Sequence, residues 1–382
     1  MSVEVIDFGC RLNLAEGAAI AAHMANHDAQ VVVNTCAVTS EAVRQARQAI
    51  RRISRERPGM PITVTGCAVH ADAAKFSAMP QVTRVVQKEL LRGPKPAVSG
   101  IGHARAFIEI QNGCDHSCTF CVTTLARGFS RSMAATDVIE AANAAVARGQ
   151  QEVVLTGVDA TSYRPSLAHL IKSILREVHD LPRLRLSSLD PAEIDDDLFD
   201  LLVSEPRIMP HVHLSLQSGD PMILKRMKRR HTPEQAVDLV KRLNSARPDI
   251  AIGADFIAGF PTETDAMHAN SLAALDTCDI MFAHIFPYSP RPGTAAAKMP
   301  QTPVPVARAR AAELRDAANN RQSAWMNTLV GETLSVLVER SRRVGHAANF
   351  ATVDLMSPLP AGAVVDIKIT GHKMGRLEGV PA

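Results

Sequence analysis

The sequence predicts an α/β protein in three parts: an N-terminal parallel α/β sheet, a central partial (β/α)6 barrel and a small C-terminal β-barrel. Over residues 1–95, short apolar runs alternate with helical patterns, which is typical of a parallel sheet. The alternation resumes near residue 104 with six strands, too few for a closed eight-stranded barrel. After Gly331 the pattern changes to short strands separated by glycine and proline turns. We therefore expect domains at 1–95, 104–325 and 330–382.

Composition limits the possible functions. The 382 residues suffice for two or three domains, and 46% hydrophobic with 21% charged residues is ordinary for a soluble globular chain. A net charge of only +3 excludes a polybasic nucleic-acid binder, so any such contact must come from local clusters. No apolar run is long enough for a membrane helix and no signal peptide is visible, so we expect a cytoplasmic protein without membrane contact. Because the cytoplasm is reducing, the seven cysteines favour metal or cluster ligation over disulfides.

The first part has one cysteine after each predicted strand. Strands are expected at 3–8, 31–35 and 62–65, and helices at 15–27 and 41–55. Cys10, Cys36 and Cys67 follow the three strands in turn. Because the carboxyl ends of parallel strands share one edge of a sheet, the three thiols could converge on one ligand. The alternative is three buried free cysteines, which are common in protein cores.

The helix at 41–57 carries arginines at helical spacing. Arg44, Arg47, Arg51 and Arg55 share one face. A solvated helix face is one interpretation, and phosphate contact through Arg47 and Arg51 is the other.

The second part follows a linker, expected at 88–104, where glycines and prolines break the periodicity. Its strands are expected at 106–110, 152–155, 184–188, 211–215, 250–255 and 280–284. Helices fill the gaps, among them 133–148, 166–178 and 233–245, and a further helix is expected at 304–328. Cys278 lies in an apolar-flanked segment and is interpreted as structural.

Three cysteines directly after the strand at 106–110 have the spacing C-x3-C-x2-C. Cys114, Cys118 and Cys121 could hold three corners of a 4Fe–4S cluster and leave the fourth iron open for chemistry. A zinc knuckle is the alternative, but zinc normally takes four ligands and no fourth cysteine or suitably placed histidine follows nearby.

This spacing resembles the signature of the radical S-adenosylmethionine (SAM) enzymes. The resemblance implies that these three cysteines are catalytic cluster ligands and that the open iron binds SAM. Later pieces of the sequence are similar to the family's SAM-contacting segments, and imply cofactor contacts from Thr156, Gly157, Ser188 and Gln217. Arg127 could meet the SAM carboxylate or an RNA phosphate, with plain surface charge as the alternative.

Three motifs in the N-terminal sequence resemble those of the methylthiotransferases, a subgroup of the radical SAM enzymes. The pieces are Phe8-Gly9-Cys10-Arg11-Leu12-Asn13, Asn34-Thr35-Cys36-Ala37-Val38-Thr39 and Thr65-Gly66-Cys67-Ala68. The resemblance implies that Cys10, Cys36 and Cys67 bind a second, auxiliary 4Fe–4S cluster. It is strongest to the branch that acts on threonylcarbamoyladenosine in tRNA. Leu14 and Thr124 depart from the family, which often has Gln and Pro there; neither change removes a thiolate.

The third part resembles the TRAM β-barrel of RNA-modifying enzymes. Strands are expected at 333–338, 350–354 and 364–369. Arg340, Arg342 and Arg343 would give this barrel a basic rim for RNA. Because the barrel is poor in aromatic residues, contact with the RNA backbone is more plausible than base stacking.

Together the resemblances imply a tRNA methylthiotransferase that uses SAM and two 4Fe–4S clusters. A 5′-deoxyadenosyl radical would remove hydrogen from C2 of N6-threonylcarbamoyladenosine next to the anticodon, and the auxiliary cluster would deliver the methylthio group. Partners would be tRNA, a sulfur donor and an electron donor such as flavodoxin or ferredoxin. Alternatives are a sister enzyme acting on isopentenyladenosine or on a ribosomal-protein aspartate and, from another class, a non-catalytic iron–sulfur RNA-binding protein.

Overall fold

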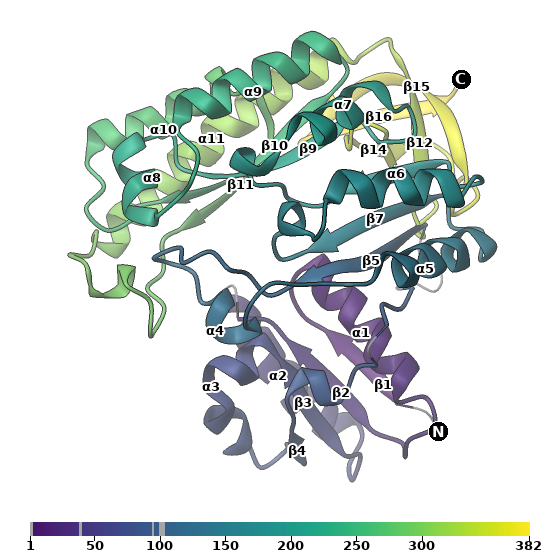
Figure 1. The fold of residues 1–382 in the computed structure, drawn as a ribbon, viewed down its shortest axis with the longest axis vertical. Coiled ribbons are helices and arrows are strands. Elements are labelled where there is room, and N and C mark those ends of the chain that lie inside the picture. Colours follow the sequence, from purple (N-terminus) through teal and green to yellow (C-terminus); the bar gives the residue numbers. More distant parts are fainter. Residues whose placement is uncertain (1–2, 38–39, 94, 99–103) are drawn as a thin grey trace.

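Three structural parts follow one another along the chain in a computed structural model that describes residues 3–37, 40–93, 95–98 and 104–382 (Figure 1). Val38 and Thr39 of the second N-terminal motif lie outside the described residues, as do residues 94 and 99–103 of the predicted linker.

The N-terminal part is a four-stranded parallel sheet in the order of the sequence. Its strands are β1 (Glu4–Asp7), β2 (Val31–Thr35), β3 (Ile62–Gly66) and β4 (Arg84–Val85). Its helices are α1 (Arg11–His23), α2 (Ser40–Glu56) and α3 (Cys67–Ser77). The predicted strands and helices are all present, but α1 spans Arg11–His23 rather than 15–27. The helix begins at Arg11 because Cys10, whose backbone is extended, is its N-cap residue.

The central part contains six parallel strands split between two sheets. One sheet has the order β5 (Arg105–Asn112), β7 (Glu152–Gly157), β8 (Arg183–Leu186), with β6 (Arg131–Ser132) antiparallel at the edge of β5. The other has the order β9 (His211–Gln217), β10 (Ala251–Ala258), β11 (Ile280–Pro287). Isolated bridges at Leu184–Ile208 and Leu189–Leu214 join the two sheets. The result is an open, partial barrel, as predicted.

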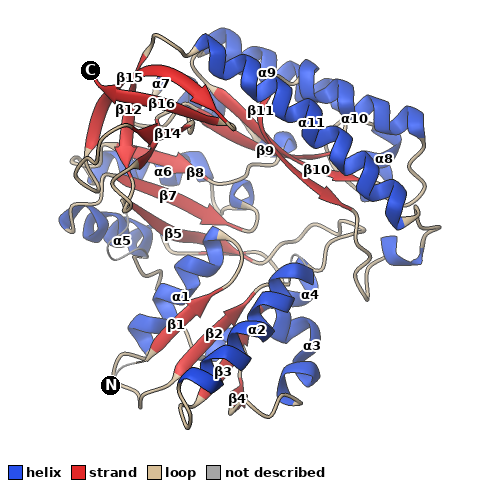
Figure 2. Cartoon of the chain, turned by 180° about the vertical axis from the view of Figure 1, so that it is seen from behind, coloured by secondary structure: helices blue, strands red, loops and turns tan. Residues whose placement is uncertain are grey.

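Helices cover the outside of this barrel (Figures 1 and 2). They are α5 (Ala135–Ala147), α6 (Leu167–Glu177), α7 (Asp196–Ser204), α8 (Pro221–Met227), α9 (Pro233–Ala246), α10 (Asp265–Thr277) and α11 (Val304–Thr328). Helix α4 (Thr123–Arg127) instead lies beside α3 of the N-terminal part. Val153 and Leu155 of β7 belong to the core that most of the covering helices share, and Val154 between them is also buried, which is the pattern of a parallel strand covered on both faces. Helix α9 begins with a capping box between Thr232 and Gln235.

The C-terminal part is a closed five-stranded barrel in the order β12-β13-β14-β16-β15. Its strands are β12 (Thr333–Val338), β13 (Val344–Ala347), β14 (Thr352–Leu355), β15 (Val364–Lys373) and β16 (Arg376–Pro381). Strands β13 and β16 were not predicted, because their short runs lack a clear apolar alternation. Phe350 of this barrel reaches into the central part, with its ring centroid 4.7 Å from that of His211 and 6.0 Å from that of Phe282.

Helices α1 and α4 join the first two parts. Figure 2 shows α1 between β1 and β5, and α4 beside α3. Ala126 of α4 belongs to the N-terminal hydrophobic core although it follows the C-x3-C-x2-C motif of the central part. The segment after Cys121 is therefore anchored in the N-terminal sheet, which positions the two cysteine-bearing regions relative to each other. None of the helices in the described ranges is both long and apolar enough to cross a membrane.

Candidate active site

Cys114, Cys118 and Cys121, called here the loop cysteines, lie on the segment after β5. Gly113 makes the turn out of the strand with φ of 74°, and a Cβ there would lie 2.0 Å from the carbonyl oxygen of Phe129. Only glycine fits this backbone and this contact. The strand and its glycine turn thus place all three thiols on one short loop at the carboxyl end of β5.

Each loop cysteine has a nitrogen donor near its sulfur. The backbone N–H groups of His116 and Thr123 lie 3.4 Å from Sγ of Cys114 and of Cys121. Nη1 of Arg229 lies 3.7 Å from Sγ of Cys118. Donors aimed at the sulfurs are a feature of protein-held iron–sulfur clusters, where they tune the reduction potential. Three thiols with three donors fit a 4Fe–4S cluster.

Arg229 is a residue that sequence reasoning missed, because it lies in an ordinary basic run at residues 225–230 and in no motif. Its guanidinium is buried and donates to Oδ2 of Asp190 at 2.9 Å and to the carbonyl oxygen of Ser215 at 2.7 Å. Burial raises the pKa of the Cys118 thiol, and Arg229 works against that rise. Arg229 therefore favours the thiolate form that a cluster ligand needs.

Cys10, Cys36 and Cys67, called here the strand-end cysteines, converge as the topology predicted. They follow β1, β2 and β3 at the same edge of the sheet, and all three line one cavity of about 630 Å³, the larger cavity. Gly9 has φ of 102°, and a Cβ there would lie 2.6 Å from Sγ of Cys36. A side chain at position 9 would thus collide with a strand-end sulfur.

The five predicted cofactor residues line the same larger cavity: Thr156, Gly157, Ser188, Gln217 and Arg127. A neighbouring, smaller cavity of about 440 Å³ contains Cys121 and shares with the larger one the residues Val122, Thr123, Gln217 and Asp255. The strand-end cysteines and Cys121 of the loop cysteines therefore border adjacent cavities. Ligation by the six cysteines and cofactor contact by the five other residues remain predictions.

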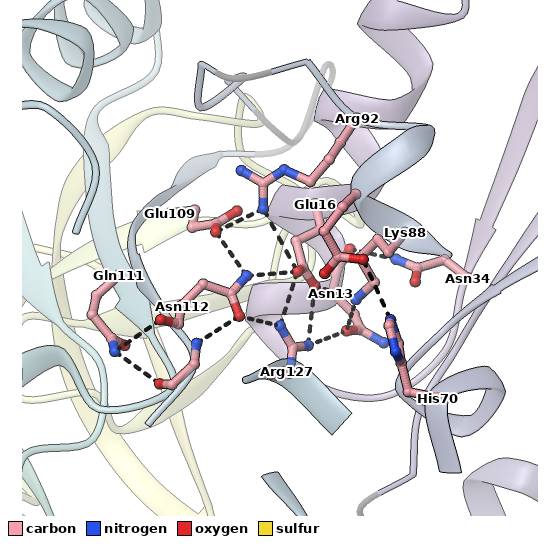
Figure 3. A network of polar contacts seen from close by, with 12 residues as sticks. Asn13, Glu16, Asn34, His70, Lys88, Arg92, Glu109, Gln111, Asn112 and Arg127 are labelled. Atoms are coloured by element: carbon pink, nitrogen blue, oxygen red, sulfur yellow. Dashed lines mark hydrogen bonds and ion pairs between the residues drawn. The ribbon is translucent and has the colours of Figure 1, made fainter. Parts of the chain in front are cut away.

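A buried polar network, called here the clasp, ties the two cysteine-bearing regions together (Figure 3). Arg127 of α4 donates to Glu16 of α1 at 2.8 Å and to Oδ1 of Asn13 and Asn112 at 2.8 and 2.9 Å. Lys88 pairs with the other oxygen of Glu16 at 2.5 Å. The guanidinium of Arg127 thus already has several partners, although its side chain also lines the larger cavity.

Electrostatics keep the clasp ionised. Burial works to raise the pKa of Glu16, but Lys88 and Arg127 outweigh it and lower that pKa to about 2. Burial likewise works against the charge of Arg127, yet its carboxylate partner raises the Arg127 pKa. No pattern in the sequence indicates that Glu16 and Arg127 pair, because they lie 111 residues apart.

Two histidines and an aspartate meet on the wall of the larger cavity. Oδ1 of Asp255 lies 3.1 Å from Nε2 of His213 and 3.2 Å from Nδ1 of His284. Burial works to raise the pKa of Asp255, but these two partners lower it overall. Their ligand atoms are close enough together for a metal ion, as are those of Cys114, His116 and Asp159.

Arg11, His211, Phe282 and Phe350 line one end of the larger cavity, called here its inner end. The guanidinium carbon of Arg11 lies 5.0 Å from the Phe350 ring centroid and 5.9 Å from that of Phe107. Burial lowers the pKa of Arg11 to about 10, so the side chain stays charged at neutral pH. Burial also lowers the pKa of His211, which is therefore neutral there.

The predicted RNA-binding arginines lie on two separate surfaces. Arg47 and Arg51 of α2 line a third cavity of about 610 Å³, the basic cavity, together with Arg44, Lys75 and Arg291. Arg340, Arg342 and Arg343 are exposed in the turn between β12 and β13. The basic cavity also contains Val122 and Ala126, so it adjoins the loop cysteines. RNA contact at either surface remains a prediction.

Two family models match the chain. Residues 108–275 match the radical SAM superfamily, and residues 2–87 match a family described as uncharacterized protein family UPF0004.

Curated relatives match between 70% and 99% of the chain. The chain is 39% identical to the threonylcarbamoyladenosine tRNA methylthiotransferase MtaB of Rickettsia prowazekii (strain Madrid E), covering 99% of this chain and 97% of the relative. It is 34% identical to MtaB of Bacillus subtilis (strain 168), over 70% and 67% of the two chains. It is 32% identical to tRNA-2-methylthio-N(6)-dimethylallyladenosine synthase of Paracoccus denitrificans (strain Pd 1222), over 98% and 96%.

Among solved structures, the fold resembles the radical S-adenosylmethionine methyltransferase TsrM of Kitasatospora setae with cobalamin and a [4Fe-4S] cluster bound. The TM-score is 0.55 with 18% sequence identity, over 75% of this chain and 68% of the other. This likeness concerns the fold alone.

Proposed function

This chain belongs to the tRNA methylthiotransferases of the radical SAM superfamily, and we propose that it adds a methylthio group to C2 of N6-threonylcarbamoyladenosine next to the anticodon of tRNA. The substrate follows from the 39% identity to a threonylcarbamoyladenosine enzyme over nearly the full length of both chains. The observation that carries the reaction type is structural: all three strand-end cysteines line one cavity, and Cys121 of the loop cysteines lines the adjacent one. A methylthio transfer needs such an arrangement, because carbon activation and sulfur supply must meet at one base.

SAM and one 4Fe–4S cluster are the cofactors of this superfamily, and we assign the cluster to the loop cysteines. When bound there, cluster and SAM supply one-electron chemistry that can take a hydrogen atom from an unactivated carbon such as C2 of adenine. We further propose a second 4Fe–4S cluster on the strand-end cysteines as the sulfur platform. The chemistry of three thiols on one cavity wall supports it.

The residues of the chain have separate tasks in this proposal. Arg229 and the backbone N–H groups of His116 and Thr123 hold negative charge on the loop sulfurs. Gln217 and Asp255, shared by both cavities, lie where a base could face both cysteine sets. The clasp fixes α1 against α4, so the two sets keep their separation.

Several partners belong to the proposal. The substrate is tRNA, contacted through Arg47, Arg51 and the turn that carries Arg340, Arg342 and Arg343. Turnover needs a sulfur donor and an electron donor such as flavodoxin or ferredoxin, in the cytoplasm where tRNA is modified. We also propose that the parts at 1–95, 104–325 and 330–382 are separate domains.

Mass spectrometry of tRNA nucleosides from cells with and without this gene tests the function. We expect loss of only 2-methylthio-N6-threonylcarbamoyladenosine, with the nucleoside that lacks the methylthio group accumulating. Loss of the dimethylallyl nucleoside's methylthio group instead would assign the chain to the sister reaction. Unchanged tRNA nucleosides would contradict the proposal and direct attention to a ribosomal-protein target or a non-enzymatic role.

A further inference from the structure

The inner end of the larger cavity has an excess of positive charge. Arg11 lines this end, and behind it lie two further guanidinium groups that act on its charge, those of Arg105 and Arg185, with two carboxylates, those of Glu152 and Glu339. Each carboxylate already has an arginine. Glu152 accepts from Arg185 at 2.9 and 3.1 Å, and Glu339 pairs with Arg105.

The guanidinium of Arg11 is the one that neither carboxylate pairs with. Within the part of the chain that the structure describes, it has no hydrogen bond and no ion pair, only the faces of Phe107 and Phe350. It is half-buried and lines the larger cavity. A partly buried guanidinium without an anion is costly, so a ligand that brings one carboxylate would complete the charge balance.

His211 gives a second, independent sign of a missing ligand. Its side chain is only 4% exposed, it lines the same end of the cavity, and neither ring nitrogen has a hydrogen-bond partner. Buried polar groups are nearly always paired, so two orphaned nitrogens beside an unpaired guanidinium indicate a polar ligand. The ring lies 4.7 Å from Phe350, which holds it in place.

The carboxylate of SAM does not explain this site. In the proposed function, the loop cysteines at the carboxyl end of β5 would hold the cluster that binds the SAM carboxylate. Arg11 contacts Phe107, five residues before the end of that strand at Asn112, which is about 16 Å at the usual rise per residue. The anion at the inner end must therefore come from another molecule.

We propose that Arg11, with His211 beside it, binds the carboxylate of the threonyl group of the modified adenosine, and thereby selects threonylcarbamoyladenosine over the apolar dimethylallyl nucleoside of the sister enzymes. The inference rests on the proposed function. Of the two tRNA nucleosides, only the threonylcarbamoyl one carries a carboxylate. A guanidinium pairs with a carboxylate through two parallel hydrogen bonds. An alkyl group bound here would leave the guanidinium of Arg11 without an anion, so binding of the dimethylallyl nucleoside is disfavoured.

Binding to the holoenzyme, prepared without oxygen and without turnover, tests the proposal. The probes are two anticodon stem-loops that carry threonylcarbamoyladenosine, one as the free acid and one as the carboxylate methyl ester. Wild type should bind the acid about tenfold or more tightly than the ester, the size of a charge-assisted hydrogen bond. Arg11→Met should bind acid and ester equally, and Arg11→Lys should keep part of the preference.

Controls separate this site from the cluster site beside it. Because Cys10 precedes Arg11, the iron content and visible spectrum of Arg11→Met must equal those of wild type for the binding comparison to count. Arg176→Met, an exposed arginine on α6, should keep the full preference. The ester comparison in wild type needs no variant, so a folding defect of Arg11→Met cannot leave the proposal untested.

The outcomes also separate this inference from the proposed function. Equal binding of acid and ester by wild type, or an unchanged preference in Arg11→Met, would overturn the carboxylate site while methylthiolation of threonylcarbamoyladenosine could still stand. If the wild-type enzyme modifies only dimethylallyladenosine stem-loops, the proposed function fails, and this inference fails with it.

Discussion

The loop cysteines come from eight consecutive residues, 114–121, whereas the strand-end cysteines come one each from the ends of three strands. The first set lies on one short loop after a strand and a glycine turn, and the region of Arg226 and Arg229 then holds that loop. The second exists only when β1, β2 and β3 are paired in register and α1 lies against them. The comparison teaches that the loop site is a local structure, while the strand-end site depends on tertiary packing, including the clasp.

The largest effect should come from removing a loop cysteine. Cys118→Ala should abolish both SAM cleavage and methylthiolation, because two thiolates hold the cluster poorly and Arg229 loses the sulfur it faces. Chromatography of 5′-deoxyadenosine and of tRNA nucleosides measures both. Cys278→Ala, a buried cysteine in the central hydrophobic core, is the matched control and should retain both activities. Full activity of Cys118→Ala would refute the claim that the three loop cysteines form the site of SAM cleavage.

The second effect concerns the clasp. Arg127→Met leaves Glu16, whose side chain is 1% exposed, without one of its two main cations, and should cost about 3 kcal/mol of unfolding free energy. Urea unfolding measures it. The double variant Glu16→Gln with Arg127→Met should lose less than the sum of the single variants, because no charge is left stranded. Strict additivity of the two losses would contradict coupling through the clasp.

Acid should weaken the same contact. The pKa of Glu16 is lowered from 4.5 to about 2, so its carboxylate stabilises the fold above pH 4.5 and this stability is lost as pH falls toward 2. The loss should reach about 2 to 3 kcal/mol. Urea midpoints between pH 5 and 3 should fall less steeply for Glu16→Gln than for wild type. The urea midpoint of Glu41→Gln, a change at an exposed ion pair, should fall with pH as steeply as that of wild type. If the midpoint of Glu16→Gln falls just as steeply, protonation of Glu16 is not the cause of the acid sensitivity.

The smallest effect is expected at the basic cavity. Arg51→Ala should weaken tRNA binding a fewfold and lower the slope of log affinity against log salt by about one, if Arg51 contacts one phosphate. Filter binding over a range of salt concentrations measures it. Lys172→Ala, an exposed cation on α6, should leave both affinity and slope unchanged. An unchanged slope in Arg51→Ala would mean that α2 is a solvated face.

Local patterns predicted most of the fold. The strand at 31–35 and the helix at 304–328 have the predicted bounds, because dense apolar runs and a long uninterrupted helical stretch leave little ambiguity. Strands β13 and β16 escaped prediction because barrel closure, rather than their own residues, makes them strands.

The candidate site was predictable only where its residues follow a motif. Cys114 and Cys36 lie in recognisable motifs. Arg127 is predicted from the sequence to meet the SAM carboxylate or an RNA phosphate, with plain surface charge as the alternative, but nothing in the sequence pairs it with Glu16. Their role depends on α1 meeting α4, a contact between distant segments that no periodicity encodes. Arg11 stood inside a quoted motif, yet its lack of an anion became visible only when Arg105 and Arg185 had taken the nearby carboxylates.

The division of labour between the two cysteine sets is the central claim, and one measurement tests it directly. Cys36→Ala holoenzyme is supplied with reductant, SAM and threonylcarbamoyladenosine tRNA, and 5′-deoxyadenosine and methylthiolated nucleoside are quantified together. The account predicts that SAM cleavage continues while methylthiolation is lost, because only the strand-end site is disturbed. Methylthiolation at the wild-type rate would contradict the account, since the strand-end cysteines would then have no part in supplying sulfur.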